Sequence, residues 1–216
     1  MFVFSEAIAE ELVFVSKLLY DKGLATAYEG NVSIRDGDRI YITPSAVCKG
    51  FLTADQVVVM DMVGAVLRAE GVKPSSEYRL HLAAYLARPG VGGIVHAHPP
   101  YCTAFAVAGQ EIYTPGYPEA LVIYGRVPLA PYGRPSTDGI WQGVPKLLAD
   151  YDAVLLQNHG ALTVGRDARE AFFRMESVEG IAKVAHLARA LGGQQQLPPE
   201  ELEALNVMHH KWRQPG

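Results

Sequence analysis

Apolar residues recur at two spacings along the chain, and the spacings predict both helices and strands. In residues 5–22 they recur every three or four positions, on one stripe of a helix that Ser5 caps and Gly23 ends. In 32–43 and again in 57–68, apolar and polar residues alternate around short glycine-containing turns. This alternation is typical of β-hairpins, the first turning at Asp36-Gly37.

The rest of the chain alternates between further helices and short strands. Helices are expected over 75–86, 103–108, 137–150, 167–191 and 198–210, and strands over 93–98, 120–124, 153–157 and 161–164. Hairpins combined with covering helices predict an α/β fold with a largely antiparallel central sheet. No repeat or change of composition divides the sequence, so we expect a single domain over 1–216, with a tail from about residue 194 that is free to be mobile.

The composition is that of a globular protein with a full core. Of the 216 residues, 49% are hydrophobic and 19% are charged, so the fold needs neither disulfides nor a metal to hold it. A metal site would therefore serve chemistry. The net charge is −4 and no basic cluster occurs, which argues against nucleic acid or an anionic membrane as a partner.

Three further features favour the cytoplasm. Cys48 and Cys102 are the only cysteines, far too few for a disulfide framework, which suits a reducing compartment. The first ten residues carry Glu6 and Glu10 and lack the basic stretch of a signal peptide. No apolar run approaches the ~18 residues of a membrane span, so we expect a cytoplasmic protein.

Three histidines stand at the ends of apolar strands. His96 and His98 are two apart in an expected strand, so their side chains share one face. His159 follows another apolar strand, in the turn Asn158-His159-Gly160. Each could be an ordinary polar residue of a sheet edge or turn. Together, three imidazoles with a fourth position left open are typical of catalytic zinc. A core or surface role is expected for His81 and His186, and the adjacent His209 and His210 near the tail are only a weak metal signal.

Glu77 is a candidate acid or base. It begins a helix after Pro74-Ser75-Ser76, where a carboxylate also simply complements the helix dipole. A functional role requires Glu77 to reach the histidines. The two serines offer hydroxyls and helix-start N–H groups, which suit a phosphate dianion.

Five motifs occur in a characteristic order. They are Gly30-Asn31-Val32-Ser33, Thr43-Pro44-Ser45, Pro74-Ser75-Ser76-Glu77, His96-Ala97-His98-Pro99 and Asn158-His159-Gly160. Together they resemble class II aldolases of the L-fuculose-1-phosphate aldolase type, within the aldolase/epimerase/adducin-head superfamily. The resemblance implies a three-layer α/β/α fold, one Zn²⁺ per subunit (Co²⁺ or Mn²⁺ as substitutes), and a homotetramer with active sites between subunits.

The resemblance also implies roles for individual residues. The zinc ligands would be His96, His98 and His159, with Glu77 as fourth ligand and as the catalytic acid/base. A phosphate pocket would comprise Gly30, Asn31, Ser45, Ser75 and Ser76. Tyr117, supplied by the neighbouring subunit, would be the acid beside the aldehyde half of the substrate.

The reaction implied is reversible cleavage of a phosphorylated sugar, a ketose 1-phosphate, to dihydroxyacetone phosphate and a small aldehyde, through a metal-stabilised enediolate. L-Fuculose 1-phosphate or a related 5-deoxypentulose 1-phosphate is the expected substrate. Three departures bear on substrate identity: Ala46 stands where a glycine is common, no tyrosine follows Tyr151, and Glu119 lies two residues after Tyr117.

Other members of the superfamily are the alternatives. A pentulose-5-phosphate 4-epimerase usually has Asp after the Ser-Ser pair and a His-Thr-His-Ser motif, whereas Glu77 and His96-Ala97-His98-Pro99 match the aldolases. A sugar-phosphate dehydratase or decarboxylase is a second alternative. A non-catalytic scaffold like the adducin head would lack the metal centre, and the intact histidine and glutamate set argues against it.

Overall fold

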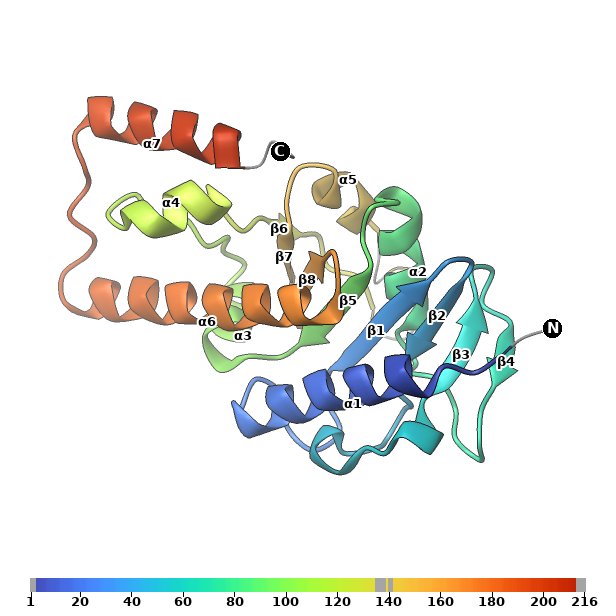
Figure 1. The fold of residues 1–216 in the computed structure, drawn as a ribbon. Coiled ribbons are helices and arrows are strands. Elements are labelled where there is room, and N and C mark those ends of the chain that lie inside the picture. Colours follow the sequence, from blue (N-terminus) through green and yellow to red (C-terminus); the bar gives the residue numbers. More distant parts are fainter. Residues whose placement is uncertain (1–2, 135–138, 140–141, 213–216) are drawn as a thin grey trace.

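One mixed sheet forms the centre of the computed structural model, which describes residues 3–134, 139 and 142–212 (Figure 1). Among these residues the strands are β1 (Asn31–Asp36), β2 (Arg39–Ile42), β3 (Val58–Asp61), β4 (Val66–Arg68), β5 (Gly93–Ala97), β6 (Leu129–Ala130), β7 (Ala153–Leu156) and β8 (Gly160–Gly165). Their order in the sheet is β4-β3-β2-β1-β5-β8-β7-β6. Every neighbouring pair is antiparallel except β6 and β7, so the expected largely antiparallel sheet is confirmed.

Helices cover both faces of the sheet. They are α1 (Glu6–Asp21), α2 (Tyr78–Ala87), α3 (Pro100–Val107), α4 (Pro118–Tyr124), α5 (Val144–Leu148), α6 (Ala168–Ala190) and α7 (Pro199–Trp212). One buried cluster joins α1, α3 and α6 to one face, and a second joins α2 and α5 to the other. The three layers implied by the resemblance are therefore present. None of the helices described is long and apolar enough to cross a membrane.

The alternation of side chains along β5 decides which face carries the histidines. Val95 and Ala97 belong to the core beneath α1 and α6. Ile94 belongs to the core beneath α2, and His96 points to that same side because strand side chains alternate. The strand thereby directs its buried histidine toward the layer that contains α2.

Capping residues place the helix starts where the sequence predicts them. The Ser5 hydroxyl accepts a hydrogen bond from the N–H of Ile8 at 3.4 Å and begins α1. The Asp167 carboxylate accepts one from the N–H of Glu170 at 2.8 Å and begins α6. Such caps satisfy N–H groups that the first helical turn leaves without partners.

Two predicted elements differ in the structure. Residues 120–124 were expected as a strand but belong to α4, because Pro118 suits the first turn of a helix and a short apolar run has no period that separates the two structures. Of the helix expected over 137–150, only α5 is present among the described residues; it begins after Gly143, whose φ is +84°, and positions 137, 138, 140 and 141 lie outside them. The short strand β6 was not anticipated.

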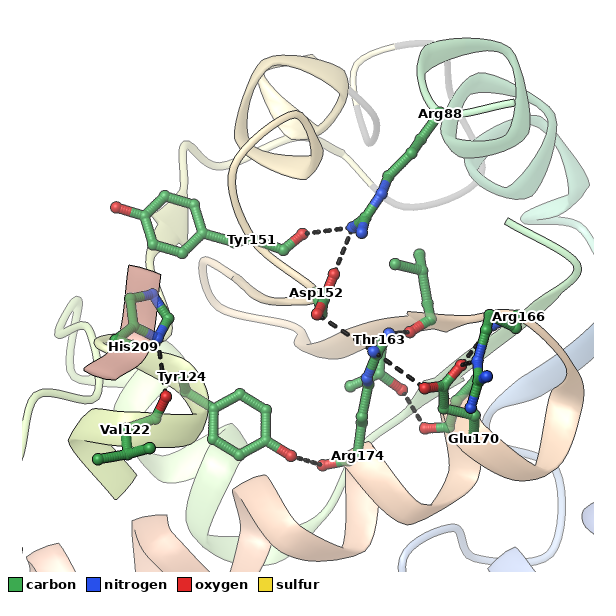
Figure 2. Close-up of polar contacts among 12 residues, drawn as sticks. Arg88, Val122, Tyr124, Tyr151, Asp152, Thr163, Arg166, Glu170, Arg174 and His209 are labelled. Carbon is green, nitrogen blue, oxygen red and sulfur yellow. Dashed lines mark hydrogen bonds and ion pairs between the residues drawn. The ribbon is translucent and has the colours of Figure 1, made fainter. Parts of the chain in front are cut away.

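An ion-pair network joins three elements at the end of β7 far from His159 (Figure 2). Arg174 of α6 lies 3.2 Å from both Asp152 and Glu170, and Arg88 at the end of α2 also pairs with Asp152. These partly buried charges fix the end of α2 against β7 and α6. They stabilise the frame of the sheet and lie outside the histidine site.

Candidate metal centre

The antiparallel pairing of β5 with β8 brings the three predicted histidines together. Ala97 pairs with Ala161, so the turn between β7 and β8 that carries His159 lies beside the end of β5. One ring nitrogen from each of His96, His98 and His159 lies within 4.8 Å of the other two. Nε2 of His98 is 3.2 Å from Nε2 of His96. The rings therefore present their nitrogens to a common point.

Second contacts orient two of the imidazoles. Nδ1 of the fully buried His96 donates to the carbonyl of Ala161 at 2.9 Å, which leaves Nε2 facing the other rings. Nδ1 of His98 lies 3.6 Å from Oε1 of Glu29. A ring N–H held by a carbonyl or carboxylate is the usual support of a metal-binding histidine.

Glu77 reaches the histidines. It is the N-cap residue of α2, and its two carboxylate oxygens divide between two rings. Oε2 is 3.2 Å from Nε2 of His96, and Oε1 is 3.2 Å from Nε2 of His159. A functional role required Glu77 to reach the histidines, and these two distances show that it does.

Burial and charge act against each other at this site. Burial would raise the pKa of Glu77, but the charge and hydrogen bond of His96, helped by His159 and Asn31, outweigh it and hold that pKa far below the usual range. Burial would lower the pKa of His96, and the Glu77 carboxylate raises it instead. The pKa of His159 falls to about 3 because of burial and the charge of His96. Glu77 is thus ionised and His159 neutral.

The donor set fits a divalent transition-metal ion. Three imidazole nitrogens and one carboxylate are ligands that Zn²⁺ takes readily. The neutral form of His159 is the form that binds metal. Nδ1 of His159 is buried without a hydrogen-bond partner in the part of the chain described, so this ring is positioned by the fold around it.

A buried chain of polar side chains continues from Glu77 into the core. Nδ2 of Asn31 donates to Oε2 of Glu77 at 2.9 Å, so the Asn31 oxygen is left to accept from Nε2 of His81. Nδ1 of His81 then accepts from the Ser33 hydroxyl at 2.6 Å, and Ser33 accepts from the Tyr85 hydroxyl at 2.8 Å. In each of these hydrogen bonds the donor is the residue farther from Glu77, so the series ends at the Glu77 carboxylate.

The sequence interpretation assigned no function to His81. Burial and the charge of His96 lower its pKa to about 3, so it is neutral. A signal was available: His81 lies four residues after Glu77, and residues four apart share a helix face. What the sequence could not supply was the pairing of β1 with β5, which places Asn31 opposite His96.

The two predicted phosphate segments lie side by side next to the histidines. The N–H of Ser45 donates to the carbonyl of Lys73 at 2.9 Å, and the N–H of Ser75 donates to the carbonyl of Thr43 at 3.1 Å. A cavity of about 180 Å³ opens between them. Its lining includes all five predicted phosphate residues and also Glu77, His98 and His159, together with Tyr28, Glu29, Pro44, Ala46 and Lys49.

Three residues in this cavity have backbone or amide constraints that the sequence alone does not show. Gly30 has a φ of +71°, and a Cβ at this position would lie 2.9 Å from the carbonyl oxygen of His96. A glycine is therefore needed here because the backbone passes close to β5. Both ends of the Asn31 amide are used by Glu77 and His81. Ala46 has a left-handed φ of +56°, a conformation that suits the glycine common at this place in the families that the motifs resemble.

Tyr117 lies elsewhere on the chain. It is the N-cap residue of α4 and lines a groove between α4 and α6 with Glu119, outside the lining of the histidine cavity. Burial and the neighbouring Glu119 carboxylate raise its pKa. Tyr117 is therefore not brought together with the histidines and Glu77 in this cavity.

The chain matches a known family over most of its length. Residues 10–186 match the family described as the class II aldolase and adducin N-terminal domain. The matched range includes the three histidines, Glu77 and the cavity residues.

Individual relatives carry two different enzyme names. An L-fuculose phosphate aldolase of Methanococcus maripaludis is 32% identical over 84% of this chain and 97% of its own length. A 3-oxo-tetronate 4-phosphate decarboxylase of Escherichia coli is 33% identical over 83% of this chain and 86% of its own length. A solved L-fuculose 1-phosphate aldolase superposes with a TM-score of 0.87 at 32% identity, covering 97% of this chain and 98% of that one.

Proposed function

Because the chain belongs to the class II aldolase and adducin N-terminal domain family, we propose that it is a metal-dependent aldolase acting on a ketose 1-phosphate. The products are dihydroxyacetone phosphate and a small aldehyde, and L-fuculose 1-phosphate or a related 5-deoxypentulose 1-phosphate is the substrate. One observation carries the proposal. Three histidine nitrogens and the Glu77 carboxylate converge at one end of a polar cavity.

His96, His98 and His159 would hold the metal, for which we propose Zn²⁺, and Glu77 would be the fourth ligand until substrate enters. When bound, the ion supplies positive charge against the negative charge that develops on the substrate oxygens. Three neutral imidazoles leave that positive charge undiminished. The backbone contact of His96 keeps its ring in place during turnover.

Glu77 would exchange the proton at the carbon next to the ketone. Its carboxylate is ionised, and the Asn31 amide holds one of its oxygens at 2.9 Å. A fixed carboxylate beside the reacting carbon can remove that proton and return it. Tyr117 of a neighbouring subunit would handle the second proton, on the aldehyde oxygen, which gains it on condensation and loses it on cleavage.

The phosphate would lie between Ser45 and the Ser75-Ser76 pair, beside Gly30 and Asn31. These residues line one cavity, and the hydrogen bonds between their segments keep the lining in shape. The resemblance supports a homotetramer with active sites shared between subunits. The two free cysteines support a cytoplasmic location, and the sequence supports a single catalytic domain over 1–216.

Decarboxylation is the second candidate, and the decarboxylase relatives at 33% identity favour it. Loss of CO₂ from a 3-oxo-tetronate 4-phosphate breaks the bond between C1 and C2 and leaves the pair of electrons on C2. The remaining three carbons are the enediolate of dihydroxyacetone phosphate. Both candidates therefore use the same metal, phosphate and proton-exchange machinery, and they differ in the group that leaves.

The first experiment follows the hydroxymethyl C–H of dihydroxyacetone phosphate in D₂O by NMR, with zinc-loaded enzyme. Exchange that a chelator abolishes would support the shared machinery. Cleavage of L-fuculose 1-phosphate would then support the aldolase. Release of CO₂ from 3-oxo-tetronate 4-phosphate without aldehyde chemistry would replace it by the decarboxylase. Absence of exchange in fully metallated protein would contradict both and direct attention to pentulose-phosphate epimerisation.

A further inference from the structure

Lys49 places a buried positive charge in the wall of the candidate active site. It begins a short 3₁₀ helix, Lys49–Phe51, just after the segment that carries Ser45. Only 1% of the residue is exposed, yet it belongs to the cavity lining together with Ser45 and the Ser75-Ser76 pair. Lys49 belongs to none of the five motifs.

The Lys49 ammonium lacks a counter-charge within the described residues. Its one hydrogen bond there runs from Nζ to the carbonyl of Val47, at 2.8 Å. An ammonium has three N–H donors, so the protein uses only part of its capacity. Burial lowers the pKa of Lys49 to about 8, and the neighbouring Cys48 offsets this effect only in part.

The carboxylates of the same cavity are engaged with other residues. Glu77 is held by His96, His159 and Asn31. Glu29 accepts from the Thr26 hydroxyl at 2.5 Å and faces His98. The free charge in this wall is therefore positive. The serines that line the same cavity, Ser45, Ser75 and Ser76, carry hydroxyl groups that can donate hydrogen bonds to an anion.

We propose that Lys49 supplies the counter-charge for the phosphate group of the substrate and makes the enzyme selective for phosphorylated substrates. The inference rests on the proposed function, because it assigns Lys49 to the substrate of that same site. A buried, unpaired charge is unfavourable, and an incoming phosphate removes that penalty while gaining charge-assisted hydrogen bonds. The left-handed Ala46, three residues earlier, holds the chain in the turn that leads to Lys49.

The test compares wild-type holoenzyme with Lys49→Met, which keeps the length of the side chain and removes its charge. Lys17→Met, at an exposed position of α1, is the matched control. Inorganic phosphate should raise the melting temperature of wild type and the control along one concentration curve. For Lys49→Met we expect that curve to shift to at least about tenfold higher phosphate, with a starting melting temperature no lower than wild type. If Lys49→Met does not fold, Lys49→Gln takes its place.

A kinetic measurement separates this inference from the proposed function. In the D₂O exchange assay, Lys49→Met should raise KM for dihydroxyacetone phosphate at least about tenfold and leave kcat within about threefold. Exchange of dihydroxyacetone, which has no phosphate, should be the same in variant and wild type. Unchanged phosphate affinity and unchanged KM would overturn the role of Lys49 while leaving the aldolase intact. Lys49-dependent phosphate binding in an enzyme without exchange would overturn the proposed function and keep the role of Lys49.

Discussion

Nε2 of His81 lies 2.5 Å from Oδ1 of Asn31, and through that one amide a fully buried histidine is connected to the carboxylate of Glu77. The amide can be oriented in only one way, because its nitrogen donates to Glu77. His81 must therefore carry its proton on Nε2 and accept from Ser33 on Nδ1. The buried contacts of His81 thus hold the Asn31 amide in the orientation that donates a hydrogen bond to Glu77.

Replacing His81 by Leu should lower kcat by about 10- to 100-fold, the usual effect of losing a residue that orients a metal-site group. We expect KM to stay within about threefold and the zinc content to remain near one per subunit, since His81 belongs neither to the ligands nor to the cavity lining. The measurement is steady-state kinetics together with metal analysis.

Tyr85→Phe is the matched control for this chain. It removes the hydroxyl at the far end and leaves the contacts from Ser33 to Glu77 in place. Its kcat should stay within about threefold of wild type. Equal losses in His81→Leu and Tyr85→Phe, or a loss of zinc in either, would show that the chain serves folding rather than orientation of Glu77.

The same histidine should make the protein sensitive to acid. Its pKa is about 3 in the folded state and ordinarily 6.5, so the unfolded chain takes up a proton at a pH where the folded chain does not. Stability from neutral His81 is complete above pH 6.5 and is lost as the pH falls toward 3, by up to about 1.4 kcal/mol per pH unit. Urea unfolding between pH 6.5 and 4.5 should show a shallower slope against pH for His81→Leu than for wild type. Parallel slopes would contradict a neutral, buried His81.

Metal binding and proton transfer should separate by mutation. His159→Ala should lose zinc and activity together, because it removes one of three convergent nitrogens. Glu77→Gln should keep most of the zinc and lose at least about 100-fold in exchange rate, since an amide cannot accept the proton. His210→Ala, at an exposed position of α7, is the control. Full zinc occupancy in His159→Ala, or normal exchange in Glu77→Gln, would contradict the assigned roles.

Local patterns were enough to predict most elements of this fold. The cap at Ser5, the alternation over residues 32–43 and the cap at Asp167 all depend on neighbours in sequence, and each predicted element is present. The error at 120–124 has the same origin. Five apolar residues suit a buried strand or a short helix. The choice between the two depends on packing against α6 and α7, and both of these helices lie far away in the sequence.

Local patterns likewise predicted only some of the residues of the candidate site. His96 and His98 could be paired from the two-residue period of a strand, and His159 was grouped with them as a third histidine at a strand end. Only the resemblance joined Glu77 to the set. Their meeting depends on the order β1-β5-β8-β7 in the sheet, which no local pattern contains. Lys49 was missed for a related reason: a single lysine in a loop gives no sign that the fold will bury it.

A substitution at Gly160 can show how tightly β8 packs against His98. A Cβ at this position would lie 2.5 Å from both the carbonyl oxygen of Ala97 and Cδ2 of His98. Gly160→Ala should therefore displace His98 and weaken zinc binding at least about tenfold. Gly180→Ala is the control: its Cβ would meet nothing within 4 Å, and it should stabilise α6 by about 0.5–1 kcal/mol. Competition with a chromophoric chelator measures zinc affinity, and equal affinities in both variants would contradict the tight fit at His98.

Tyr117 must come from a neighbouring subunit if it acts at all, because in its own chain it lines the groove between α4 and α6. Tyr117→Phe should slow aldol cleavage by at least about 100-fold and slow proton exchange much less, since only cleavage moves a proton on the aldehyde oxygen. Equal slowing of the two reactions would assign Tyr117 another role.

Mixed oligomers can show whether Tyr117 acts in the site of a neighbouring subunit. When Tyr117→Phe and Glu77→Gln subunits are co-expressed and assemble at random in a ring, about a quarter of the sites combine an intact Glu77 with an intact Tyr117 from the next subunit. Cleavage should then recover toward a quarter of the wild-type rate. Co-expression of Glu77→Gln with His159→Ala is the control and should recover nothing, because both residues belong to the same chain's site. A Tyr117 mixture no more active than its parents would contradict a Tyr117 supplied by the neighbouring subunit, and a different residue would then remove the proton from the aldehyde oxygen during cleavage.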